Sequence, residues 1–216
     1  MKKERCFVLR FCLLSAFLLL TFAVTRVDLQ NTGIGDFVVG FGKINIRFHR
    51  FTGVHLWIYN LTDRLSAVPL LICFGFGILG FYQLVKRKSI FKVDRDILIL
   101  GLLYIVTIGF YLFFEVNIIN YRPILIDGKR EASYPSSTTV LCLTVMLTAA
   151  RQFQIRIKNK KIAGAVSEIS AGYGILMMIA RLVSGVHWLT DILGGVLLSL
   201  RLVSAYNRRC ETENRI

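Results

Sequence analysis

The sequence predicts an all-α membrane protein, a single domain over residues 1–216 built as a bundle of six transmembrane helices. The composition is 55% hydrophobic and the mean hydropathy is +0.59, and long apolar segments recur along the chain. A helix needs roughly 17 to 25 mostly apolar residues to cross a bilayer. Six segments meet or approach this requirement: 7–25, 66–85, 97–114, 136–150, 162–180 and 187–206. The fourth is short and the last contains Arg201, so these two are the least sharply bounded.

The distribution of basic residues predicts the topology. Of the 27 lysine and arginine residues, 18 lie in the amino-terminal segment, in the loops after the second and fourth helices, or in the carboxyl-terminal segment. The positive-inside rule therefore predicts that both termini are cytoplasmic. The net charge of +14 reflects this topology and an attraction to anionic lipid head groups. A nucleic-acid partner is not expected, because the cations do not gather on a soluble domain.

The segment 26–64 is too polar to span a membrane. Glycines come first and are followed by the run V-H-L-W-I-Y-N-L-T-D. This order predicts a loop leading to a helix that lies in the membrane interface, with Trp57 and Tyr59 at head-group level.

Three ionisable residues stand close together near the end of the chain. Arg181, His187 and Asp191 are the only Asp, Glu, Lys, Arg or His residues between 168 and 201. Such groups in an apolar helix cost on the order of 2.5 to 3.5 kcal/mol each, so they indicate a functional site. His187 and Asp191 are four residues apart, and if this segment is helical they share one face and can hydrogen-bond. A carboxylate in that position orients an imidazole and stabilises its charged form.

Two further polar motifs are predicted on the same face of the membrane. The loop between the third and fourth helices contains Arg122-Pro123 and then Pro135-Ser136-Ser137. In the six-helix topology this loop and the turn before His187 are both extracytoplasmic. Arginine binds phosphate bidentately and stays charged, so the combination is suited to phosphoryl transfer.

These motifs resemble the three signature motifs of the type 2 phosphatidic-acid phosphatase superfamily, which are related to those of the vanadium haloperoxidases. The family patterns are K-x6-R-P, P-S-G-H and S-R-x5-H-x3-D, and the resemblance covers residues 115–195. It implies a lipid phosphate or diphosphate phosphatase with its active site at the extracytoplasmic face. His187 would be the nucleophile that forms a phosphohistidine, and Asp191 would orient it. Four residues would hold the phosphate: Arg122, Arg181, Ser136 and Ser137.

The resemblance also implies a phosphorylated lipid as substrate, a multi-pass location in the bacterial plasma membrane, and neither a metal nor another cofactor. The sequence leaves the particular lipid and the oligomeric state open.

Among the departures of the chain from the family patterns, three bear on the argument. Ala180 replaces the serine of the third motif, Glu115 replaces the lysine of the first, and Thr138 replaces the histidine of the second. In the family that histidine protonates the leaving oxygen, which a threonine hydroxyl cannot do. Losing a general acid slows a reaction by about 100 to 10,000-fold, and the loss is largest for an alkoxide leaving group. The departures therefore favour a lipid diphosphate over a simple ester, or a weak or inactive enzyme.

Residues nearby offer replacements for the missing groups. Glu115 is a candidate acid if burial raises its pKa, and the alternative is an ion pair with Arg122 or Arg130. Lys129 and Arg130 are candidates for the lost cation. Two further acid candidates, each with the alternative of an interfacial role, are His49 and His55. The other functions left open are a silent relative that binds or transports a phospholipid, and a lipid phosphotransferase.

Overall fold

The computed structural model describes residues 2–33 and 38–213, and nearly all of them lie in or between helices. The first part of the chain contains α1 (Lys2–Val24), two short strands, and three helices: β1 (Gln30–Asn31), β2 (Val38–Val39), α2 (Gly42–Thr52), α3 (Leu56–Leu65) and α4 (Ala67–Arg87). The second part contains the short 3-10 helix η1 (Ile90–Lys92), α5 (Arg95–Val116), α6 (Ser137–Arg156), α7 (Lys160–Val183) and α8 (Leu189–Glu213). β1 and β2 pair antiparallel, with Gln30 opposite Val39.

Each of the six segments predicted to span the membrane corresponds to a helix, although the helices of the fourth and sixth begin at Ser137 and Leu189. Five helical stretches of the described chain are long and apolar enough to cross a bilayer: Phe7–Val24, Leu56–Arg87, Arg95–Val116, Lys160–Val183 and Leu189–Asn207. The protein is therefore a multi-pass membrane protein. The remaining predicted span, 136–150, corresponds to α6, which does not reach this apolarity.

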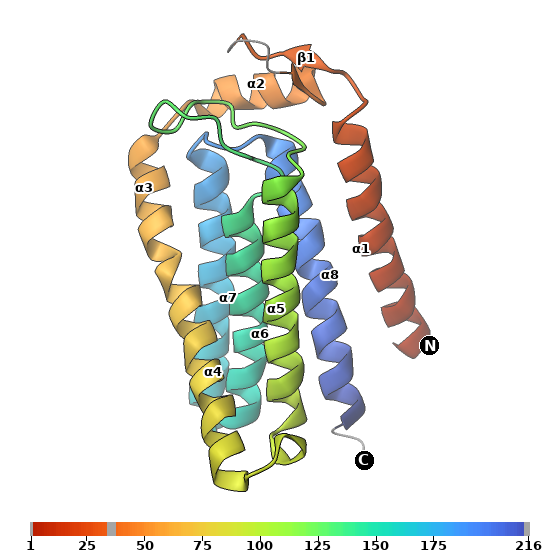
Figure 1. The fold of residues 1–216 in the computed structure, drawn as a ribbon, viewed down its shortest axis with the longest axis vertical. Coiled ribbons are helices and arrows are strands. Elements are labelled where there is room, and N and C mark those ends of the chain that lie inside the picture. The colour runs from red at the N-terminus through yellow and green to blue at the C-terminus, as the bar shows by residue number, and fades with distance from the viewer. Residues whose placement is uncertain (1, 34–37, 214–216) are drawn as a thin grey trace.

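The composition of α6 follows from its central position. This helix packs against α4, α5, α7 and α8, and Figure 1 shows it within the bundle. Polar side chains such as Thr144, Thr148 and Gln152 are buried along it. Their hydrogen-bonding groups meet protein rather than lipid, so α6 has less need for an apolar surface.

The expectation for residues 54–63 was wrong. This segment forms α3, which continues into α4 along the bundle, whereas α2 lies across the end of the bundle (Figure 1). Asn45 holds α2 to the first turn of α8, because its side chain donates to Thr190 Oγ1 at 3.0 Å and accepts from the Thr190 backbone N–H at 3.2 Å. Hydrogen bonds from Arg181 to the Tyr59 carbonyl and the Thr62 hydroxyl hold α3 upright against α7.

The two ends of the bundle carry different parts of the chain. Figure 1 shows α2, the α5–α6 loop and the α7–α8 turn at one end, and the α4–α5 connection with the ends of α1 and α8 toward the other. This arrangement brings the loop with Arg122 and the turn with His187 to the same end of the bundle. The same result is expected if successive helices cross the membrane in opposite directions. Arg215, which was counted in the carboxyl-terminal basic segment, lies outside the described residues.

Candidate active site

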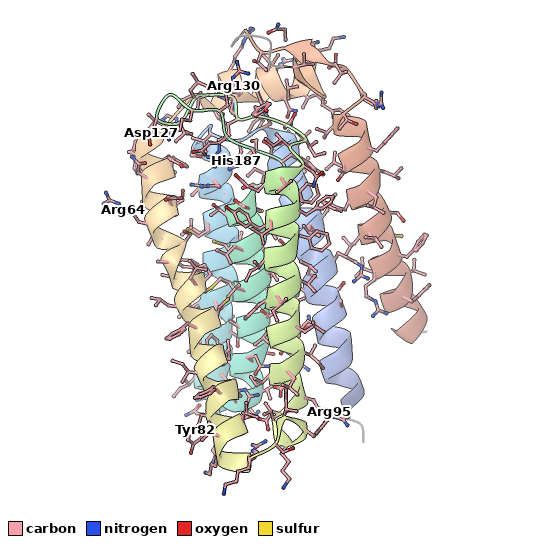
Figure 2. All side chains as sticks on the ribbon, viewed as in Figure 1. Arg64, Tyr82, Arg95, Asp127, Arg130 and His187 are labelled. Carbon is pink, nitrogen blue, oxygen red and sulfur yellow. The ribbon has the colours of Figure 1, made fainter. Side chains whose placement is uncertain are left out.

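The turn between α7 and α8 carries His187 and is held from above by the segment that joins α2 to α3. Gly185 has a φ of 70°, and a Cβ at this position would lie 1.9 Å from the Gly53 carbonyl oxygen. Only glycine fits such an approach. The Ser184 carbonyl accepts the backbone N–H of His55 at 2.9 Å. Figure 2 shows His187 at this end of the bundle, below the loop that bears Asp127 and Arg130.

The other two histidines have structural contacts. His49 places a ring nitrogen 3.1 Å from the Gly185 carbonyl oxygen and packs against Trp188 in a tilted arrangement, with 5.5 Å between ring centroids. His55 places a ring nitrogen 2.9 Å from the Thr52 carbonyl oxygen. The His49 ring therefore braces the α7–α8 turn, whereas the His55 ring contacts the end of α2.

His187 and Asp191 face each other as their spacing predicts, but the expected direct hydrogen bond is not formed. His187 Nδ1 lies 3.8 Å from Asp191 Oδ2, which is an ion-pair distance and too long for a hydrogen bond. The Ser133 hydroxyl lies between the two groups. Its oxygen is 3.0 Å from His187 Nδ1, and it donates a short hydrogen bond to Asp191 Oδ2.

Both carboxylate oxygens of Asp191 accept hydrogen bonds. Oδ2 accepts the Trp188 backbone N–H at 2.8 Å as well as the Ser133 hydroxyl, and Oδ1 accepts from Asn120 Nδ2 at 3.2 Å. An ionised carboxylate only accepts hydrogen bonds, so these contacts match a negative charge at this position. Asp191 is fully buried.

The two motif arginines meet beside α3. The Arg181 and Arg122 guanidinium carbons lie 4.6 and 5.5 Å from the centre of the Tyr59 ring, which is within cation–π range. Arg181 donates to Thr62 Oγ1 at 3.0 Å and has its only carboxylate contact in the described chain with the exposed Asp63, at 3.6 Å. Arg122 Nε lies 3.1 Å from Glu131 Oε2.

Several nitrogens at this point have no hydrogen-bond partner among the described residues. They are His187 Nε2, Arg122 Nη1 and Arg181 Nε, and all three atoms are buried. The positive charges of Arg122 and Arg181 both act on His187, so the three side chains are close in space. Buried polar groups are normally paired. Two guanidinium groups and a bare imidazole nitrogen therefore form a site suited to an anion.

The environment of His187 keeps its imidazole neutral. Burial, with a smaller contribution from the charges of Arg122 and Arg181, lowers the pKa of His187 from 6.5 to about 4, and Asp191 acts in the opposite direction. A neutral imidazole has a lone pair on one ring nitrogen. His187 is thus in the form that a nucleophile requires at neutral pH.

The serines of the second motif lie at the start of α6. Ser136 is buried, its hydroxyl accepts from Thr139 Oγ1 at 3.0 Å, and its backbone N–H donates to the Asp191 carbonyl at 3.1 Å. Its N–H group is therefore engaged by the protein. Ser137 is half-buried and stands in the first turn of the helix, where the helix dipole favours negative charge.

Glu115 and Thr138, which depart from the first and second family patterns, line one cavity. A cavity of about 320 Å³ between α4, α5 and α6 is lined mainly by apolar side chains, together with Glu115, Ser133, Ser137 and Thr138. Glu115 is exposed, and its side chain forms no hydrogen bond or ion pair within residues 2–33 and 38–213. The ion pair considered between Glu115 and Arg122 is not formed, because Arg122 meets Glu131.

Lys129 and Arg130 are exposed in the loop above the site. The loop folds back on itself there, since the Ile126 and Lys129 backbones exchange two hydrogen bonds, of 3.1 and 2.8 Å. The side-chain cations that act on His187 are Arg122 and Arg181, so a replacement role for Lys129 or Arg130 stays a proposal.

Four residues of the site were missed by the sequence analysis: Ser133, Asn120, Tyr59 and Thr62. Ser133 stands two residues before the Pro135-Ser136 pair and Asn120 two residues before Arg122, so their nearness to the motifs was the available signal. Tyr59 and Thr62 come from α3, far from every motif, and no local pattern indicates their role.

Comparison with known proteins agrees with the motifs. Residues 113–214 match the model of the PAP2 superfamily, which confirms the resemblance seen in the sequence. The fold is similar to that of a solved protein described as the first transmembrane PAP2 type phosphatidylglycerolphosphate phosphatase from Bacillus subtilis. The TM-score is 0.65 at 19% identity, over 94% of this chain and 96% of that one. No curated protein matches the chain in sequence.

Proposed function

We propose that this protein is a metal-independent lipid phosphate or diphosphate phosphatase that acts through a phosphohistidine on His187, at the extracytoplasmic face of a bacterial plasma membrane. One observation carries the proposal: the buried Nε2 of His187 has no partner among the described residues, and the positive charges that act on His187 are those of Arg122 and Arg181, which also have buried, unpartnered guanidinium nitrogens. The superfamily match and the fold support a phosphatase role for a membrane protein.

The reaction has two steps. In the first, the Nε2 lone pair attacks phosphorus, an N–P bond forms and the bond to the leaving oxygen breaks. Arg122 and Arg181 bind the oxygens of the transferred group, over which the charge is spread, and Asp191 stabilises the imidazolium. In the second, water attacks phosphorus, the N–P bond breaks, and inorganic phosphate leaves. In this mechanism Ser137, in the first turn of α6, adds a hydroxyl donor.

The substrate class follows from the group at position 138. Thr138 is buried beside the cavity and cannot supply a proton to an alkoxide. A phosphate leaving group needs no such proton, so a lipid diphosphate is the substrate that these residues favour. The mainly apolar lining of the cavity is compatible with a lipid chain. Phosphatidylglycerol phosphate, the substrate named for the similar Bacillus subtilis protein, is the monoester to compare.

The same substitutions favour a second candidate. With Thr138 and Glu115 in place of the family's histidine and lysine, the site is also compatible with binding or transporting a phospholipid without hydrolysis. A phosphotransferase would pass the group from His187 to an acceptor other than water.

Phosphate release by the purified protein tests these alternatives. The substrates are lysophosphatidic acid, phosphatidic acid, phosphatidylglycerol phosphate and a polyprenyl diphosphate, each with and without EDTA. We expect release, fastest from the diphosphate and unaffected by EDTA, and loss of it in His187→Ala. Asp191→Asn should lower it by orders of magnitude, whereas His55→Ala, a histidine outside the site, should not.

The variants also separate the candidates. Wild-type rates in His187→Ala would overturn the nucleophile assignment. Lipid binding without release would establish the binding function. Release that requires an added acceptor alcohol would establish the transferase.

A further inference from the structure

We propose that Ser133 is a positioning residue that links Asp191 to His187 and determines which nitrogen of His187 is the nucleophile. This inference rests on the proposed function for its kinetic consequences, but the hydrogen-bond geometry that carries it is independent of any substrate.

Counting hydrogens locates the proton of the imidazole. A serine hydroxyl has one hydrogen, and the Ser133 hydroxyl donates it to Asp191 Oδ2. Its oxygen therefore accepts at its other contact, the 3.0 Å contact with His187 Nδ1. In a neutral imidazole only one ring nitrogen carries a proton. That proton is on Nδ1, and the lone pair is on Nε2.

This assignment agrees with the surroundings of the other nitrogen. His187 Nε2 is buried without a hydrogen-bond partner in the described chain, near the two arginine charges. A protonated Nε2 would point its N–H donor toward two positively charged groups. An unprotonated Nε2 instead points its lone pair toward the position where the arginines would hold the phosphate group. The serine bridge thus sets the nucleophilic nitrogen on the side where the arginines hold phosphate.

The position of Ser133 is held by its neighbours. Its backbone N–H donates to the Asn120 carbonyl at 2.9 Å, and Asn120 itself donates to Asp191. The next residue, Tyr134, is fixed by a 2.8 Å hydrogen bond between its hydroxyl and that of Thr21. Its ring packs so closely on α8 that a Cβ at Gly194 would lie 2.6 Å from it. Ser133 is therefore locked between Asp191 and His187.

The bridge also matters during the reaction. When Nε2 bonds to phosphorus the imidazole becomes positively charged, and Nδ1–H becomes a stronger donor. The acceptor is a hydroxyl that is itself hydrogen-bonded to a carboxylate, so the negative charge of Asp191 reaches Nδ1 through Ser133 as well as across 3.8 Å of space. Removal of an outer partner that orients a functional histidine typically lowers activity about 10 to 100-fold.

A double-mutant cycle tests the link. Turnover is measured for the wild type, Ser133→Ala, Asp191→Asn and the double variant. If Ser133 transmits the effect of Asp191, Ser133→Ala lowers kcat about 10 to 100-fold in the wild type with little change in KM, and by less than about twofold in the Asp191→Asn background. Equal losses in both backgrounds would overturn the link. The matched control is Ser199→Ala, a buried hydroxyl bonded only to backbone carbonyls, and it should leave kcat unchanged.

Nitrogen-15 NMR of the imidazoles tests the tautomer without any turnover. The chain has three histidines, and His187→Gln assigns the relevant pair of signals. We expect Nδ1 protonated and Nε2 bare in the wild-type protein at neutral pH, and a mixture of tautomers in Ser133→Ala. A wild-type signal from protonated Nε2 would overturn the proposal even if Ser133→Ala failed to fold. Absence of phosphate release with the expected tautomer would instead refute the proposed function alone.

Discussion

The acid limb of the pH–rate profile is a sensitive test of the site, because a histidine nucleophile reacts only when it is neutral. Burial and the nearby arginines lower the pKa of His187 from 6.5 to about 4. At pH 5 about 90% of the side chain is then neutral, against about 3% for an unperturbed histidine, a difference of roughly 30-fold in rate. The sign is fixed by the reactive form: the rate falls as the pH falls through about 4.

The assay is kcat/KM as a function of pH, which reports the ionisations of the free enzyme and the free substrate. A phosphate monoester has its own second ionisation near pH 6, at roughly the value for a phosphorylated side chain, so each profile is compared between enzymes on one substrate. Arg122→Gln removes a cation that lowers the pKa of His187. Its acid limb should therefore move to higher pH even though the rates are lower.

The lowered pKa of His187 would be refuted if the acid side of the kcat/KM profile gave an enzyme pKa near 6.5 that stayed the same in Arg122→Gln. A titration of His187 by nitrogen-15 NMR, without substrate, gives the same pKa directly. This titration tests the lowered pKa of His187 separately from its role as nucleophile. If His187 is neutral at pH 5 but His187→Ala does not change turnover, only the assignment of the nucleophile is refuted.

Three further predictions follow from local geometry and topology. Gly185→Ala should destabilise the protein by about 1 to 3 kcal/mol and lower kcat, because its Cβ meets a carbonyl oxygen, whereas thermal unfolding of Gly172→Ala, with open space at that position, should match the wild type. Thr138→His should raise monoester hydrolysis more than diphosphate hydrolysis, by up to about 100 to 10,000-fold, and equal effects on both would mean that another group already supplies the proton. In a variant without native cysteines, single cysteines at Asp127 and at Ser89 should react with an impermeant thiol reagent from opposite sides of the membrane, with Asp127 extracytoplasmic; labelling of both from one side would refute the topology.

Much of the secondary structure could be predicted from local hydropathy. The expected spans 97–114 and 162–180 correspond to α5 (Arg95–Val116) and α7 (Lys160–Val183), because apolar length is a property of the segment itself. The prediction was weakest at α6, whose threonines and glutamine face other helices. Hydropathy records how polar a residue is, and it does not tell whether lipid or protein surrounds it.

The same distinction applies to the candidate site. The closeness of His187 to Asp191 was predictable from their spacing, although His187 lies in the turn before α8 and not in the helix that the expected pairing assumed. The family motifs also identified both arginines. The position of α3 was not predictable, because Tyr59 and Thr62 reach Arg181 only after the chain has folded back over more than 100 residues.

The sequence by itself determined which long segments are helices and that the three motifs lie at the same end of the bundle, since these depend on local composition, spacing and the order of the helices. Only the tertiary structure decided that Ser133, 54 residues before His187, stands between the imidazole and the carboxylate. The physical reason is one of distance. His187 Nδ1 and Asp191 Oδ2 are 3.8 Å apart, which is too far for a direct hydrogen bond. The group that bridges them comes from the α5–α6 loop, and Tyr134 fixes that loop against α1 and α8.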